Sequence, residues 1–263
     1  MIALFRKGFC MIYDLQKASM WKRISAFLFD TILLGIAAVL FAWALSNVLG
    51  YDDYTADLQS AYARYSEEYG VNFNLTLTEY DALSPEELDR LNTAYTALSN
   101  DAAAASAYNM IIHLVLVITS LGLLMGFVLT EFIVPIWLGN GQTLGKKIFG
   151  IGLMQTDGVR INGRILFVRT ILGKYTIETM VPVFIIMMIW FGMLGLTGTL
   201  VLLGIGLLQL IMVLATRKRT AIHDALAGTV AVDIASQLIF ANREAMIAYK
   251  EKIHAQEAAR AEY

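Results

Sequence analysis

Three long apolar runs organise the sequence, at residues 24–49, 110–138 and 181–215. Each run exceeds the ~20 residues that an α-helix needs to cross a bilayer. The third run is too long for one ordinary span, and the glycines in its middle favour a break at Gly195–Gly198. The pattern therefore predicts four transmembrane helices, at 24–49, 110–138, 177–195 and 199–216.

The composition agrees with an integral membrane protein. Hydrophobic residues make up 57% of the chain and charged residues only 16%, whereas a soluble domain has about 45–50% apolar and about 25% charged residues. Cys10 is the only cysteine, which excludes an intrachain disulfide. The basic segment 1–23 lacks a small-residue cleavage site, so we expect the first span to act as the targeting signal.

The distribution of charge predicts the orientation. Segments 1–23, 139–175 and 217–219 are rich in Lys and Arg, whereas 50–108 holds eleven Asp/Glu and two Lys/Arg. Because basic segments remain in the cytoplasm, we expect both termini inside the cell membrane and 50–108 outside. The alternative, one long helix over 181–215, would export the basic residues at 217–219.

The segment 50–108 is predicted to form helices. Ser84, Pro85 and Glu87 have the order of a helix start, with an N-cap serine, a proline at the first position and a glutamate at the third. Five tyrosines recur at helical spacings, at Tyr51, Tyr54, Tyr62, Tyr65 and Tyr69. Two interpretations stay open, namely an acidic cap that concentrates cations or binds a partner, and a solvated helical hairpin without a ligand.

The segment 139–175 contains a β-hairpin signal. Asp157 and Gly158 lie between the β-prone residues 148–154 and 159–161, which suits a tight turn. Residues 229–232 are a candidate third strand, and 217–263 ends in a helical tail. The predicted fold is an all-α membrane protein with four transmembrane helices, a small cytoplasmic β-hairpin and an external helical insertion.

Polar residues interrupt three of the predicted spans at a similar depth. Asp30 and Glu131 each lie ~10 Å inside the cytoplasmic surface at ~1.5 Å per residue, and Gln209 lies at a comparable depth. A charge within the membrane costs roughly 2.5–3.5 kcal/mol on insertion scales, so it is normally paired or used. The sequence therefore predicts one polar layer across spans one, two and four.

Two roles for this layer stay open. Asp30 and Glu131 could bind a monovalent cation or carry protons, because burial raises the pKa of one carboxylate. Alternatively, the layer is a structural ion-pair network in which Asp30 and Asp224 accept hydrogen bonds from basic residues, namely Arg23, Arg169 or Arg219. Glu131 has no charged partner within its own span, so neither role is favoured for this residue.

Other motifs add less. The histidines are dispersed, and neither a metal-ligand cluster nor a nucleophile elbow is present. We therefore expect no enzyme, no cofactor, no metal and no nucleic-acid partner. Lys146 and Lys147 form a basic turn suited to anionic lipid heads. Gly122 and Gly126 form a G-x-x-x-G pair, which permits close contact within the bundle or in a homodimer.

Three segments, 22–30, 141–150 and 219–229, resemble the ordered motifs of the RDD family of membrane proteins. The motif positions are Arg23, Asp30, Gly141, Gly145, Lys146, His223 and Asp224. The segment 50–108 is longer than the usual connection in that family. The resemblance implies a polytopic membrane protein, often bacterial, with a role in transport. We expect a small transporter, most concretely a cation/proton exchanger, and the alternative is a scaffold or accessory subunit that binds protein partners.

The topology can be tested by cysteine scanning on a Cys10→Ala background. A membrane-impermeant thiol reagent added to intact cells should label cysteine at position 60, because 50–108 is predicted to be outside. Positions 155 and 250 should react only after the membrane is opened. External labelling at position 250 would contradict the four-span arrangement.

Overall fold

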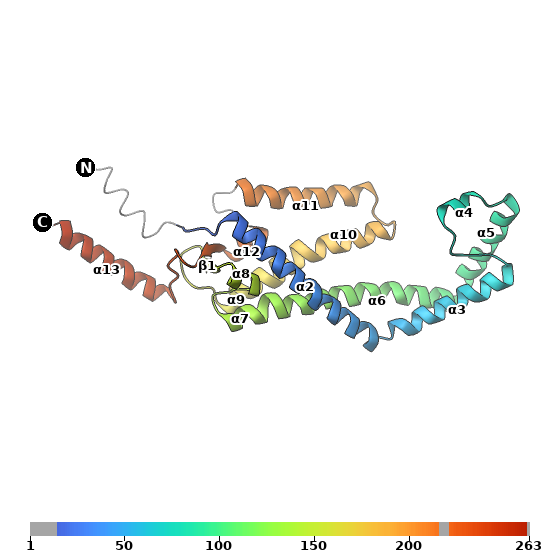
Figure 1. Cartoon of the computed structure of the whole chain (residues 1–263), viewed down its shortest axis with the longest axis horizontal. Helices are drawn as coiled ribbons and strands as arrows, with labels where there is room; N and C mark the ends of the chain where they lie inside the picture. The colour runs from blue at the N-terminus through green and yellow to red at the C-terminus, as the bar shows by residue number, and fades with distance from the viewer. Residues whose placement is uncertain (1–14, 216–220, 262–263) are drawn as a thin grey trace. The chain divides into compact units, whose positions relative to one another are not determined.

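A computed structural model describes residues 15–215 and 221–261, so Cys10 and the basic residues 217–219 lie outside the described part. The chain is mostly helical (Figure 1) and divides into two compact units. The first unit comprises Met1–Ala38 and Leu124–Tyr263, and the second comprises Val39–Leu123.

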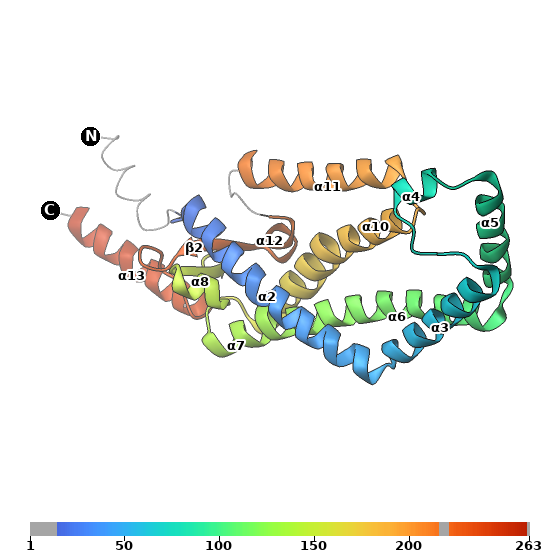
Figure 2. The ribbon, with the colours of Figure 1, turned by 45° about the vertical axis from the view of Figure 1, so that its right-hand side comes forward.

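Three continuous helical stretches of the described residues are long and apolar enough to cross a membrane: Met20–Val48, Ala102–Leu138 and Gly163–Trp190. The first is α2 (Met20–Val48). The second consists of α6 (Ala102–Phe127), the π-helix η1 (Val128–Ile133) and α7 (Val134–Leu138). The third consists of α9 (Gly163–Phe167), the π-helix η2 (Val168–Met180) and α10 (Val181–Trp190). A further apolar helix, α11 (Leu196–Ala215), runs beside α10 (Figure 2).

The third stretch departs from the sequence prediction at both ends. It begins at Gly163, within the segment 139–175 that is predicted to be cytoplasmic, because Asn162 caps it by accepting a hydrogen bond from the Ile165 amide at 2.9 Å. It ends at Trp190, before the predicted join, and Gly192 makes the turn with a φ of 71°. Positive φ is readily available only to glycine, so Gly192 sets the position of the break.

The small sheet is antiparallel, and its strands are far apart in the sequence. Strand β1 (Ile151–Gln155) pairs with β2 (Thr229–Asp233) over their full length. The candidate strand at 229–232 is thus confirmed as β2. The predicted hairpin is shorter than expected: the Gln155 amide donates a hydrogen bond to the Val159 carbonyl at 2.8 Å, and the segment after Asp157-Gly158 forms only isolated bridges, from Arg160 to Met154 and from Val159 to Phe240. Pairing of β1 with the apolar β2 buries Leu153 and Val232 completely.

The sheet lies at the centre of the core of the first unit. Its buried members come from β1, β2, the start of α2 and the segment before η2, namely Ala18, Ala26, Ile151, Leu153, Ile161, Leu166 and Ala231. Two short helices flank the strands, α8 (Leu144–Ile148) before β1 and α12 (Ile222–Ala227) before β2. Helix α13 (Arg243–Ala261) follows β2 and forms the helical tail.

The second unit is built from α3 (Tyr51–Tyr69), α4 (Leu77–Asp81), α5 (Pro85–Asn100) and the first part of α6. The predicted helix start is confirmed, because Ser84 and Glu87 form a reciprocal capping box at the beginning of α5. Helices α3 and α5 pack around buried Ala61, Leu98 and Ala104. The acidic segment thus has its own small apolar core.

Candidate functional site

A cavity of about 300 Å³ lies in the first unit and is lined by nine charged or polar residues together with seven apolar ones. The charged and polar residues come from α2, α8, η2, α11 and α12, namely Arg23, Asp30, Lys146, Arg169, Lys174, Glu178, Gln209, His223 and Asp224. Most of the residues predicted from the sequence as a polar layer or as family motifs therefore meet at this cavity.

Asp30 fastens α8 to α2. Its side chain is buried and accepts hydrogen bonds from the Thr143 hydroxyl and, at 2.8 Å, from the Gly145 amide. Among the described residues, Asp30 thus accepts from a hydroxyl and a backbone amide rather than from Arg23 or Arg169, while Arg219 lies outside the described residues. A Cβ on Gly145 would lie 2.5 Å from the carbonyl oxygen of Ala26, so only glycine permits this close approach.

Glu131 lies in η1 with only 1% of its surface exposed. Lys174 of η2 donates a hydrogen bond to its Oε1, and the Lys146 ammonium lies 3.8 Å from its Oε2. Glu131 therefore has charged partners, although none lies within its own span. Two lysines from other elements neutralise Glu131.

Asp224 accepts hydrogen bonds from two side chains at the cavity. The Arg169 Nε donates to its Oδ1 at 2.8 Å, as one of the predicted pairs requires, and the Thr229 hydroxyl donates to the same oxygen at 2.9 Å. Burial alone would raise the pKa of Asp224, but the Arg169 guanidinium and the hydrogen bonds from Arg169 and Thr229 hold this pKa well below its usual range. Asp224 is therefore a permanent anion that anchors η2 to α12.

His223 connects the same two elements through Glu178. The His223 backbone amide donates a hydrogen bond to Oε1 of Glu178 at 2.8 Å. The His223 Nδ1 lies 2.7 Å from the other carboxylate oxygen, Oε2. The Arg169 guanidinium lies 2.9 Å from His223 Nε2, and because an arginine only donates, this nitrogen accepts and the ring is neutral. Burial lowers the pKa of His223, in agreement with a neutral ring.

Gln209 brings α11 to the cavity. Its side chain hydrogen-bonds to Glu178. Its Oε1 is buried and has no hydrogen-bond partner among the described residues. An unsatisfied buried oxygen costs free energy and marks a place where a proton donor or a cation would be stabilised.

The charges of the cavity and of Glu131 beside it balance. The bases are Arg23, Lys146, Arg169 and Lys174, and the acids are Asp30, Glu131, Glu178 and Asp224. Burial lowers the pKa of Lys146 to about 8, against the attraction of Glu131, so this lysine gives up its proton most readily above neutral pH. Within residues 15–215 and 221–261, no group of three His, Cys, Asp or Glu side chains could hold a metal ion.

Both π-helices contribute to this cluster. Glu131 lies in η1, and Arg169, Lys174 and Glu178 lie in η2. Such wide turns are rare and occur frequently at functional sites. Sequence reasoning missed Lys174, although the spacing of five between Arg169 and Lys174 matches the i→i+5 hydrogen-bond spacing of a π-helix and would have placed the two side chains near one face.

Three predicted residues lie away from the cavity. Gly141 adopts a φ of 62° beneath Ile161, where a Cβ would lie 2.2 Å from the isoleucine side chain. Gly126 approaches Ala38 of α2, with 3.2 Å between a Cβ at this position and the Ala38 nitrogen. The close approach at Gly126 is thus made to another helix of the same chain. The predicted homodimer through Gly122 and Gly126 stays a prediction.

Long apolar helices around a buried charged cavity are typical of a polytopic helical membrane protein. The sequence model of the RDD family matches residues 17–228. The chain therefore belongs to the RDD family, whose members are membrane proteins. No curated protein and no solved structure matches the chain.

The role of Asp30 can be tested by Asp30→Asn. The amide would present a donor to either the Thr143 hydroxyl or the Gly145 amide, so we expect a loss of about 1–3 kcal/mol in the free energy of unfolding. Thermal unfolding in detergent measures this loss, with the exposed Asp53→Asn as the matched control. Equal stability of the two variants would contradict the conclusion that the hydrogen bonds of Asp30 hold α8 against α2.

Proposed function

We propose that the protein is a small transporter that exchanges a monovalent cation for a proton at the charged cavity. The observation that carries the proposal is the position of Glu131, a buried carboxylate held between Lys174 and Lys146 beside a cavity of about 300 Å³. A carboxylate with two positive neighbours can accept another cation when one of these neighbours becomes neutral.

Lys146 is the neighbour best suited to this change. Its pKa of about 8 means that it is protonated at lower pH and increasingly neutral above that value. Loss of its proton leaves the cluster with one excess negative charge, and a monovalent cation beside Glu131 restores the balance. Because an uncompensated buried charge costs several kcal/mol, binding of the cation and release of the proton are coupled.

The arrangement in the membrane completes the proposal. Helix α11, an apolar helix of 20 residues that also carries Gln209, provides a fourth span beside the three long stretches. The basic segments place α8, the sheet and both termini in the cytoplasm and the second unit outside, as in a cell-membrane protein. The exposed Lys147 on α8 then faces the anionic lipid heads of the inner leaflet.

A scaffold or accessory subunit is the second candidate. The balanced charges favour it, because Glu131, Asp224, Glu178 and Asp30 all have donors without any ligand. A cluster of this kind can simply hold the helices together while another surface binds a partner. A measurement of ion flux distinguishes the two functions, since an exchanger carries ions across the membrane and a scaffold does not.

The exchanger predicts a pH-dependent flux in proteoliposomes. Sodium uptake with proton release should rise as the pH increases through about 8, because Lys146 then loses the proton that competes with the cation. Glu131→Gln should abolish the flux, and Lys146→Met should abolish its coupling to protons.

The matched control is Lys147→Met, which removes the adjacent exposed lysine and should leave both rate and pH dependence unchanged. Flux that survives in Glu131→Gln would refute the exchanger. Wild-type protein without flux of Na⁺ or K⁺ would leave the scaffold as the better account.

A further inference from the structure

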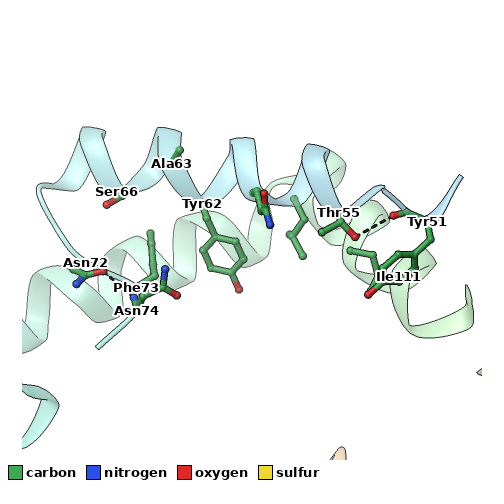
Figure 3. A pocket seen from close by; sticks show the side chains of 11 residues that line it. Tyr51, Thr55, Tyr62, Ala63, Ser66, Asn72, Phe73, Asn74 and Ile111 are labelled. Atoms are coloured by element: carbon green, nitrogen blue, oxygen red, sulfur yellow. Dashed lines mark hydrogen bonds between the residues drawn. The ribbon is translucent and has the colours of Figure 1, made fainter. Parts of the chain in front are cut away.

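The second unit contains a larger cavity of about 580 Å³ (Figure 3). It lies between α3, the segment 70–76 that follows α3, and Ile111 of α6. Its volume is within the ~300–1,000 Å³ typical of small-molecule sites. The cavity is separate from the charged cluster and does not depend on the function proposed above.

Aromatic rings and neutral polar groups form the walls. Tyr51, Tyr62 and Phe73 contribute rings. The polar lining residues are hydroxyl and amide side chains, namely Thr55, Gln59, Ser66, Asn72 and Asn74. Figure 3 shows the Tyr62 ring projecting from α3 toward the side on which Phe73 and Asn74 lie. The lining contains no charged side chain.

The walls are held in place before any ligand binds. The Tyr62 ring meets Phe73 edge-to-face with centroids 5.3 Å apart, and Phe73 meets Tyr95 of α5 in the same way at 4.9 Å. Asn72 accepts a hydrogen bond from the Asn74 amide at 2.9 Å, which fixes the segment after α3. A preformed aromatic wall loses little conformational entropy on binding.

The chemistry of the lining limits the class of ligand. An anion would find no basic side chain in the lining and would be repelled by the segment 50–108, which holds eleven acids and two bases. A small, strongly hydrated metal ion would find no carboxylate in the lining. An organic ammonium ion fits both conditions, because aromatic faces attract poorly hydrated cations and the acidic surface raises their local concentration.

We propose that this cavity binds a small organic ammonium ion, with the cationic group against the ring of Tyr62. The hydroxyl and amide side chains around it accept or donate hydrogen bonds to the polar remainder of the ligand. The acidic residues of the unit attract the ligand over a distance, and the rings select it at contact.

The test compares two probes on the full chain in lipid nanodiscs by isothermal titration. Choline carries a quaternary ammonium, and 3,3-dimethyl-1-butanol has the same shape with carbon in place of nitrogen. We expect choline to bind at least about tenfold more tightly than its neutral analogue, in line with a desolvated cation–π contact. Equal affinity for the two probes would overturn the proposal in favour of a site for neutral polar molecules.

Variants locate the binding. Tyr62→Leu should weaken choline binding about tenfold or more, while Tyr62→Phe, which keeps the ring, should retain it. Tyr80→Leu removes an exposed tyrosine of α4 that does not line the cavity and should change nothing. Unchanged affinity in Tyr62→Leu, or no choline binding to wild-type protein with native helicity, would overturn the proposal.

Discussion

Opposite charges that meet across separate elements hold the first unit together. Lys174 neutralises Glu131 and joins η2 to η1, and Arg169 neutralises Asp224 and joins η2 to α12. Removing one partner of a buried pair costs about 3–5 kcal/mol, because the other charge stays in a medium of low polarity. Each pair therefore fixes the position of two elements that apolar packing alone, being non-directional, would leave free to slide.

This constraint explains why close backbone approaches occur around the cavity. Gly145 lets the start of α8 reach Asp30, and Gly173 lets η2 lie against the backbone of His223, where a Cβ would be 2.7 Å from its Cα. The same neutrality restricts what the cavity can bind. A net charge added to the cluster must be compensated inside it, and the low pKa of Lys146 provides the means.

The sequence predicts the apolar helices, the start of α5 at Ser84 and most of the cavity residues, because these depend on composition, local capping and depth along a span. It predicts a strand at 229–232 but not that this strand is the full-length partner of β1, since pairing of strands distant in the chain follows from the burial of both. It also misses Lys174 as the partner of Glu131, because that contact requires a π-helical turn on a different element.

The central claim is that Glu131 and Lys174 stabilise each other inside the first unit, and a double-mutant cycle tests it most directly. The free energy of unfolding in detergent should fall by about 3–5 kcal/mol in Glu131→Gln, which leaves Lys174 without its partner, and in Lys174→Met, which leaves Glu131 with only the more distant Lys146. The double variant should be more stable than the sum of the two losses predicts, because it buries neither charge. Strictly additive losses would contradict the account.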